Sequence, residues 1–465
     1  MAAENATPVG EKTAGPDKPV PGVGLINDWL REQSPAFSAW DIGGQFRLRY
    51  ESKDNAGFVA SRDFTRNLDH SNDYLLLREK IHVGYRPLNW LGVFVEGRDA
   101  SSHSDKRDPS PDVDTFDLHQ ASISVGDVNK FPMSLKIGRQ ELVYGDERFA
   151  GTADWGNTGR SFDALKVRFE NELLSVDAFS GRVVVPYDHH FNEANDYDWF
   201  SGVYASTRQL ASWQETQLYC LSRNASAQAP NAAATGIPGA PGSARDIYTL
   251  GARLKSLPGK LRGWDYSAEV ARQFGSVSQS GVRRDLEALA ADATAGYTWT
   301  KAFGSPRLGI GYTFASGDRD PNDGRSETFE LLFGTNHRFY GVMDLWGLRN
   351  IHSGRVTGSI KPLKRLSLSA EYHSLWLADT RDFFYTESGP GRIGNGYGRN
   401  PQFDSYVGSE LDVLADYPVT PYLNIQLGYG HFFVGDYIRQ SVNSAPATGG
   451  SQDANWFYAQ VRFNF

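Results

Sequence analysis

Apolar and polar residues alternate along most of this chain. In one stretch, Phe46, Leu48 and Tyr50 take one parity, and Arg47 and Arg49 take the other. Because neighbouring side chains of a β-strand point to opposite faces, this alternation predicts a strand with one apolar and one polar face. Eighteen segments share the pattern, and most have about 9 to 14 residues, the length of a tilted transmembrane strand. They lie at residues 45–50, 74–86, 90–98, 117–125, 133–144, 161–170, 173–184, 199–209, 213–223, 246–255, 264–274, 287–300, 306–314, 350–361, 365–376, 407–417, 422–433 and 454–465.

The connections between these segments alternate in length. Those after even-numbered segments are mostly short, as at 87–89, 171–172, 362–364 and 418–421. Those after odd-numbered segments are often long and polar, as at 52–73, 224–245, 315–349, 377–406 and 434–453. Outer-membrane barrels have short periplasmic turns and long extracellular loops, whereas a soluble sandwich or propeller has no reason to keep this parity. The sequence therefore predicts an all-β fold, a transmembrane antiparallel β-barrel of about 18 strands.

The boundaries of this barrel follow from the same pattern. Residues 40–465 form the predicted barrel, and residues 1–39 read as a flexible N-terminal tail, with room for one helical turn near residues 26–31. The chain ends in a strictly alternating strand that closes on the aromatic Phe465. Such an ending looks like the signal that the bacterial barrel-assembly machinery reads, so we expect that machinery to be a partner.

Composition narrows the class of protein further. Aromatic residues make up 13% of the chain, yet its mean hydropathy is −0.47. No run of about 18 apolar residues occurs, so transmembrane helices are excluded, and a membrane protein this polar must be a closed barrel. The single cysteine, Cys220, rules out an internal disulfide, and a net charge of −8 argues against a nucleic-acid partner.

The expected location is the bacterial outer membrane, in contact with the lipid bilayer and lipopolysaccharide. Met1 is followed by a polar stretch in place of a secretory signal. We expect that such a signal preceded the mature chain and was removed. The protein is expected to be a monomer.

The face opposite the apolar one is strongly basic. If the apolar parity faces lipid, the lumen receives far more Arg and Lys than acids such as Glu96, Glu269 and Glu410. Fixed positive charge in a narrow pore favours anionic solutes, although the same groups could instead pair with lumen acids into a bracing network. Glu79 and Arg139 fall on the lipid parity and do not fit the pattern. The candidate pore lining, which would bind the substrate, is Arg47, Arg49, Arg78, Lys80, Arg98, Lys136, Lys166, Arg168, Arg253, Arg355, Arg365 and Arg462.

Three motifs resemble a known family. They are Leu-Lys-Ile-Gly-Arg-Gln-Glu-Leu at 135–142 with its continuation to Arg148, Leu-Phe-Gly-Thr-Asn-His-Arg-Phe-Tyr-Gly at 332–341, and Asp-Leu-His-Gln-Ala at 117–121. Together they resemble the alginate-export porins of Gram-negative outer membranes, and Gly-Arg-Gln-Glu-Leu at 138–142 is the most specific part. The resemblance implies an eighteen-stranded barrel with an electropositive pore. It also implies passive export of an anionic polysaccharide, with alginate as the type substrate, and leaves room for periplasmic proteins that deliver it.

Two other functions stay open at this point. The first is a general porin or an uptake channel for small anions or oligosaccharides. The second is an outer-membrane enzyme, but His82, His119, His352 and His373 are scattered and no Gly-x-Ser-x-Gly elbow occurs. We therefore expect a channel and no catalytic residues.

The longest connection, residues 316–348, is too long for a plain hairpin loop and contains apolar runs. It is expected either to fold into the mouth of the barrel as a constriction or to pack on neighbouring external loops. Its acidic part begins like a calcium loop at Asp318 and Asp320, but Asp323 stands where Gly is needed and Phe329 where Glu is needed. No cofactor or metal site is therefore predicted, with loose Ca²⁺ binding by this loop as the alternative.

Overall fold

A computed structural model describes residues 24–68, 71–128, 130–226, 244–279 and 281–465, and almost all regular structure in it is β-strand. The strands are β1 (Trp40–Asp54), β2 (Asn72–Leu88), β3 (Leu91–His103), β4 (Asp114–Val125), β5 (Met133–Gln140), β6 (Phe162–Glu170), β7 (Ser175–Val185), β8 (Glu193–Thr207), β9 (Gln214–Ala225), β10 (Arg245–Ser256), β11 (Trp264–Gln279), β12 (Val282–Thr298), β13 (Arg307–Ala315), β14 (Arg325–Ser326), β15 (Ile351–Leu363), β16 (Leu366–Leu377), β17 (Tyr406–Pro418), β18 (Leu423–Val434) and β19 (Ala454–Asn464). Two α-helices, α1 (Leu25–Gln33) and α2 (Asp436–Asn443), and two 3₁₀ turns, η1 (Pro35–Ala39) and η2 (Pro446–Thr448), complete the elements.

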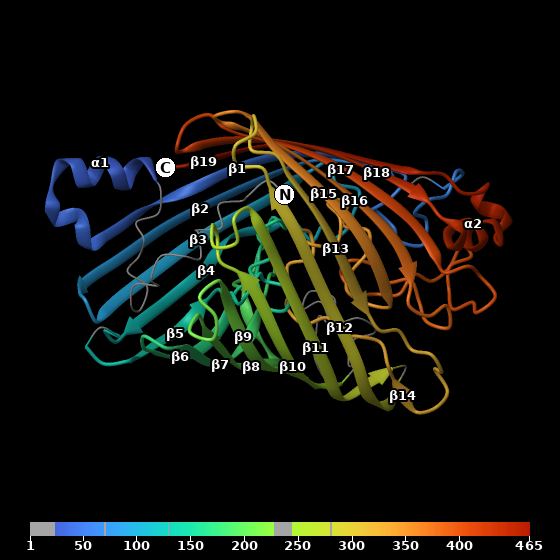
Figure 1. The fold of residues 1–465 in the computed structure, drawn as a ribbon, viewed down its shortest axis with the longest axis horizontal. Helices are drawn as coiled ribbons and strands as arrows, with labels where there is room; N and C mark the ends of the chain where they lie inside the picture. The colour runs from blue at the N-terminus through green and yellow to red at the C-terminus, as the bar shows by residue number, and fades with distance from the viewer. Residues whose placement is uncertain (1–23, 69–70, 129, 227–243, 280) are drawn as a thin grey trace.

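The strands form one closed antiparallel barrel (Figure 1). Each strand pairs with its neighbour along the chain, except that β13 pairs directly with β15. The short β14 stands outside this order, because its two residues make only a parallel bridge to β12. Eighteen strands therefore make the wall, as the sequence predicted.

The two ends of the chain close the barrel. β1 pairs with β19 from Gln45 opposite Asn464 to Asp54 opposite Asn455. The terminal residue takes part, since the Gly44 amide donates to the Phe465 carbonyl at 3.1 Å and the Phe465 amide donates back at 3.0 Å. Each strand of the wall thereby has a paired neighbour on both sides, as a sheet that spans a bilayer requires.

The two faces of the wall have the expected chemistry. Ile81 is 51% exposed and Ile310 is 64% exposed on the outer face, whereas Arg47 and Arg78 on the inner face are at most 2% exposed. Glu79 is exposed on the outer face. Arg139 also lies on the outer parity, where the carboxylate of Asp163 on β6 neutralises it at 2.8 Å.

The ends of the barrel differ in the way that the connection lengths predicted. At one end, called the turn end, the strands are joined by short turns such as 89–90 and 364–365. At the other, the loop end, lie long loops, including 141–161, 316–350 and 378–405. One prediction is wrong there: the alternation ended at residue 274 and resumed at residue 287, whereas β11 and β12 pair with each other as far as Gln279 and Val282.

The predicted tail is partly ordered. Residues 1–23 lie outside the described residues, but α1 and η1 follow them and precede β1. Asn27 fastens α1 to the barrel, donating to the Asp41 carboxylate and accepting from the Ile42 amide at 2.6 Å. Neither α1 nor α2 is long and apolar enough to cross a membrane.

The hydrophobic core lies inside the barrel, toward the loop end. Phe329, Phe333, Tyr340 and Trp346 of the 316–350 loop are at most 1% exposed. They pack in one cluster with inward apolar side chains of the wall and of the other long loops. Of the two predicted positions for residues 316–348, the structure therefore has the inward one.

Candidate pore and the loops that close it

Three arginines of the predicted lining stand together on the inner wall. Arg47 and Arg49 lie on β1, and Arg78 lies on β2 directly opposite Arg47. All three are buried. They point at residues 154–156 of the 141–161 loop, here called the 154–156 turn. The arginine cluster (Arg47, Arg49 and Arg78) thus meets a segment of backbone inside the barrel.

The contacts between the arginine cluster and the 154–156 turn are hydrogen bonds to backbone oxygens. Arg47 donates to the carbonyl oxygens of residues 154, 155 and 156 at 2.6, 3.2 and 3.1 Å. Arg49 donates to that of residue 155 at 2.7 Å, and Arg78 to that of residue 154 at 3.0 Å. Since hydrogen bonds from charged donors are the strong ones, the turn is firmly held.

The side chains of the turn add to this hold. The Asp154 carboxylate lies 2.8 Å from Arg78 and 3.5 Å from Lys80. Burial opposes its ionisation, but these two cations outweigh burial and hold the pKa of Asp154 well below its usual value. Trp155 is sandwiched between the Arg49 guanidinium, 3.7 Å from the ring centroid, and the His337 ring, stacked at 3.7 Å and 4°. The turn is therefore packed on both sides.

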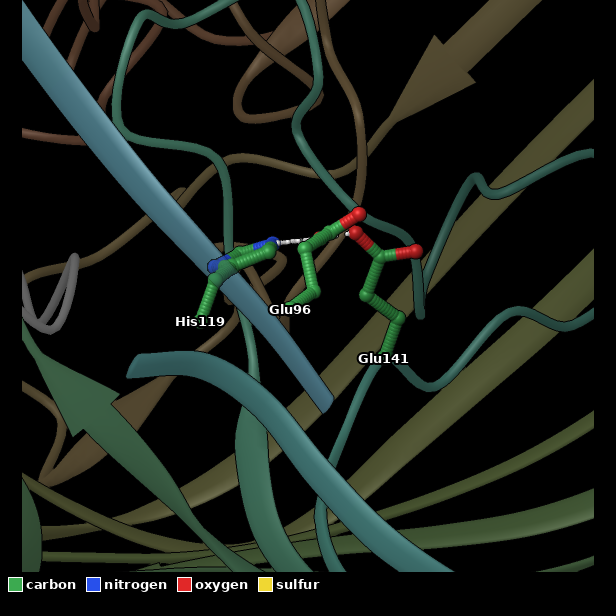
Figure 2. A group of neighbouring side chains, drawn as sticks. All are labelled: Glu96, His119 and Glu141. Carbon is green, nitrogen blue, oxygen red and sulfur yellow. Dashed lines mark hydrogen bonds and ion pairs between the residues drawn. The ribbon is translucent and has the colours of Figure 1, made fainter. Parts of the chain in front are cut away.

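Beside the turn, Glu96, His119 and Glu141 bring one ligand atom each within 4.8 Å of one another, and Figure 2 shows the His119 ring facing Glu141. Such a set could hold a metal ion, but its hydrogen bonds do not fit one. Arg98 donates to His119 Nδ1 at 2.8 Å, so the ring proton lies on Nε2, which is 3.1 Å from Glu141. His119 then has no lone pair to offer, and Lys80, 3.9 Å from Glu96 and 3.8 Å from Glu141, supplies the positive charge.

A second ionic cluster fastens the loops to the opposite wall. Arg148 of the 141–161 loop lies 3.0 Å from Glu269 on β11 and 2.8 Å from Asp292 on β12. Its guanidinium also donates to the Tyr340 hydroxyl at 3.1 Å, and Arg355 on β15 lies 3.1 Å from Asp292. Arg148 thereby joins the 141–161 loop to β11, to β12 and to the 316–350 loop, and Arg355 shares the Asp292 carboxylate.

Other residues of the predicted lining are paired with acids. Arg98 meets Asp114, Arg253 meets Asp146, and Arg168 lies 2.7 Å from Asp177. The bracing network that the sequence left open as an alternative is therefore present for these arginines, as it is for Arg355.

Four residues of the predicted lining remain. Lys136 and Lys166 stand opposite each other on β5 and β6 and are partly exposed, nearer the turn end. Arg462 on β19 is also partly exposed and stands directly opposite Arg47 of the arginine cluster. Arg365 does not belong to a strand. It lies exposed in the turn between β15 and β16 and donates to the Val419 carbonyl, because the strand begins one residue later, at Leu366.

The inner wall is not basic on all sides. Glu410 and Asp412 on β17 are at most 1% exposed and have no arginine or lysine within ion-pair distance among the described residues. They accept instead from backbone amides of the 316–350 loop, those of Met343 at 3.0 Å and Val342 at 3.4 Å. Basic groups therefore stand on β1–β6, with further buried arginines on β9, β10 and β15, and β17 carries acids that receive the loop.

A cavity of about 950 Å³ lies on the loop side of the 154–156 turn. Its lining includes Lys53, Tyr74, Trp155, Arg160 and Glu387. Arg160 donates to carbonyl oxygens of the 316–350 loop, and no carboxylate lies within ion-pair distance of it among the described residues. Burial, with Arg223 nearby, lowers the pKa of Arg160 to about 10, and burial beside Asp344 raises that of Glu387 to about 7.

Three side chains inside the barrel, Ser353, His373 and Glu371, resemble the serine, histidine and acid of a hydrolase. Ser353 Oγ lies 3.2 Å from His373 Nδ1, and His373 Nε2 lies 3.7 Å from Glu371. Ser353 and His373 are 0% exposed, and none of the three lines the cavity. A nucleophile must reach its substrate, so this buried group does not form an accessible catalytic site.

A model of the alginate export family matches residues 38–449. The chain belongs to this family. It is an outer-membrane β-barrel channel, and the resemblance found in the three sequence motifs is confirmed. A search of curated proteins finds no match.

Among solved structures, similar barrels come from Pseudomonas aeruginosa. The outer-membrane protein OprD has a TM-score of 0.59 at 12% identity, over 92% of this chain and 93% of that one. OccK7 (OpdD) has a TM-score of 0.55 at 14% identity, over 91% and 99%. OpdK, solved with vanillate, has a TM-score of 0.55 at 13% identity, over 91% and 98%. At these identities the likeness shows the fold alone.

The family motifs fall where the closing loops meet the wall. His119 and Glu141 belong to the network beside the turn, Arg148 anchors the 141–161 loop, and His337 stacks on Trp155. Parity along strands could not assign these roles, because most of these residues lie in loops. The signal that could have found them was the motifs themselves.

Proposed function

We propose that this protein is a passive channel for an anionic, uronate-containing polysaccharide of the alginate type, which it exports through the outer membrane. The turn end faces the periplasm in this proposal and the loop end faces outward, as in other barrels with short and long connections. The observation that carries the proposal is the gathering of Arg and Lys on the inner wall of β1–β6 inside a family of export channels.

The basic wall offers a route from one end of the barrel to the other. Lys136 and Lys166 stand toward the turn end, the arginine cluster lies beyond them, and Arg160 lines the cavity at the loop end. A carboxylate on each sugar would meet successive cations, and no single site would hold the polymer tightly. Weak binding at several sites is what conduction requires.

Conductance in planar bilayers tests this function. We expect anion over cation selectivity, and a current that uronate oligomers block while neutral oligosaccharides of the same length do not. Cation selectivity would refute the basic route, and equal block by neutral sugars would refute recognition of the uronate carboxylate.

A second candidate function is uptake of short oligosaccharides or small anions. The cavity favours it, because a volume of about 950 Å³ is in the range that holds one small ligand, and the loops fill the space around it. OpdK, a barrel of similar fold, has been solved with vanillate, a small carboxylate. A length series separates the two functions: block that strengthens with every added uronate favours the polymer, and block that is complete with a monomer or dimer favours uptake.

A further inference from the structure

One side of the turn end carries a group of cations without acids. The turns that join β10 to β11, β12 to β13 and β15 to β16 span residues 257–263, 299–306 and 364–365, and none of them contains Asp or Glu. Because these strands are neighbours in the wall, the three turns form one continuous arc. The cations of this arc, here called the basic rim, are Lys260, Arg262, Lys301, Lys364 and Arg365.

The protein does not neutralise the basic rim. All five side chains are exposed, and among the described residues no carboxylate lies within ion-pair distance of any of them. Arg307, one residue beyond the 299–306 turn, is different, because its guanidinium lies 2.6 Å from the Asp265 carboxylate. The charge of the basic rim is therefore available to a partner outside the chain.

The excess of positive charge is confined to this arc. In the other turns of the same end, Asp127 and Glu172 offset Lys130 and Arg208. The chain as a whole has a net charge of −8, so the basic rim stands out against an acidic background. Fixed charge of one sign, gathered on one surface, attracts a partner of the opposite sign. The partner of the basic rim is therefore anionic.

Aromatic side chains give the level of the basic rim in the membrane. Trp264 on the outer face of β11 stands directly opposite Tyr297 on β12, with their ring centroids 5.0 Å apart. Trp299 extends this group, 5.1 Å from Tyr297. Trp and Tyr collect at the level of the lipid headgroups. Arg262 and Lys301 stand two residues from Trp264 and Trp299, so the basic rim lies at the level of the lipid phosphates.

The same arc also presents apolar side chains. Phe303 is 77% exposed at the 299–306 turn, and Leu363 is exposed beside the 364–365 turn. The Lys361 amide donates to the Gly304 carbonyl at 2.8 Å, so these two turns are joined. Cations that alternate with exposed apolar groups on an ordered surface are typical of a lipid interface, where the apolar groups enter the acyl region and the cations meet the headgroups.

We propose that the basic rim is a docking surface for anionic phospholipids, whose headgroup phosphates it binds in the leaflet at the turn end of the barrel. The inference goes beyond the proposed function and takes from it only the orientation, in which the turn end faces the periplasm. It gives the β10–β16 side of the barrel a preference for negatively charged lipid that the rest of the wall lacks.

The basic rim lies apart from the route proposed for the solute. Lys136 and Lys166, the cations of the inner wall nearest the turn end, stand on β5 and β6, and at least four strands separate them from β10–β16. Arg365 donates to the Val419 carbonyl of the next turn, so its side chain runs along the rim. This position explains why Arg365, which strand parity assigned to the pore, has no partner in the lumen.

Native mass spectrometry tests this inference on the full chain, released from micelles that contain equal amounts of phosphatidylglycerol and phosphatidylcholine. The wild type should retain phosphatidylglycerol in preference to phosphatidylcholine. Lys301→Gln and Lys364→Gln should each reduce this preference by roughly fivefold, the effect of one cation beside an anionic lipid surface. The two changes combined should reduce it by roughly 25-fold if they act independently.

The matched control is Lys130→Gln, since Lys130 is also an exposed lysine of a turn at this end but shares its turn with Asp127. This variant should keep the wild-type preference, and circular dichroism shows whether each barrel has formed. Equal retention of the two lipids by the wild type, or an unchanged preference in the combined variant, would overturn the inference. So would a combined variant that weakens the block by uronate oligomers in neutral bilayers, because the basic rim would then lie on the solute route. Cation selectivity of the wild type would instead overturn the proposed function.

Discussion

Replacement of Arg148 by Met should loosen the packing of the loops inside the barrel. The side chain is 6% exposed and meets Glu269 at 3.0 Å and Asp292 at 2.8 Å. It also holds Tyr340 of the 316–350 loop at 3.1 Å. Methionine keeps most of the volume, so the change removes the ion pairs and the hydrogen bond to Tyr340 with little loss of packing.

The size of the effect follows from what remains around the two carboxylates. Removal of one partner of a buried ion pair costs about 3–5 kcal/mol, because the other charge stays buried. Here Arg355 still lies 3.1 Å from Asp292, and the Tyr219 hydroxyl still donates to Glu269 at 2.9 Å. Both acids keep one partner, so we expect the lower limit, a loss of about 3 kcal/mol in the free energy of unfolding.

Urea unfolding in detergent, followed by tryptophan fluorescence, measures this loss, since Trp155 and Trp346 lie in the loops that Arg148 fastens. The control is Arg338→Met, whose side chain is 37% exposed and 3.9 Å from Glu147, a kind of pair worth at most about 1 kcal/mol. If Arg148→Met loses no more stability than this control, Arg148 does not anchor the loops and the reasoning from buried charge is wrong.

Three other expectations follow from the geometry. The pKa of the Glu387 carboxyl is raised to about 7 in the folded protein from a usual value of 4.5. The stability that this group contributes is therefore complete below about pH 4.5 and is lost as pH rises to about 7. The melting temperature of the wild type should fall over that window more than that of Glu387→Gln, and equal slopes would exclude this role. Lys166→Gln should lower the ratio of anion to cation permeability. Arg365→Gln, which changes a residue in the turn between β15 and β16, should leave that ratio unchanged. If Arg365→Gln lowers the ratio and Lys166→Gln does not, Lys166 does not lie on the route of the anion. Addition of Zn²⁺ or removal of metal by EDTA should not shift the melting temperature. Arg98 already donates a hydrogen bond to His119, and Lys80 supplies the positive charge beside Glu96 and Glu141. A rise in melting temperature with Zn²⁺ that is lost in His119→Gln would show that the histidine does bind metal.

The limits of sequence-based prediction are clearest at the strand ends. The alternation made the hairpin of β11 and β12 too short. It predicted that β11 ends at residue 274, whereas β11 runs to Gln279. Beyond the lipid band an outward residue need not be apolar, so the strand continues where its alternation does not. The same reason explains why β1 extends to Asp54 and β2 begins at Asn72.

Some residues of the candidate site could be predicted from the alternation along strands, and others could not. Parity found Arg47, Arg49 and Arg78, because they lie on strands whose outer residues face lipid. Parity could not find Asp154, Trp155 or Arg148, which lie in loops without a repeating pattern. Nor could it tell that Arg98 and Arg253 meet acids while Arg47 meets backbone carbonyls.

The sequence by itself therefore determined the wall of this protein. Contact with lipid on one face imposes a period of two, and pairing between consecutive strands makes each neighbour local in the chain. Only the tertiary structure decided what fills the lumen, because the contacts that do so join residues far apart: Arg47 and Asp154 are 107 positions apart, and Arg148 and Asp292 are 144. No local periodicity encodes such contacts, and they hold the long loops inside the lumen.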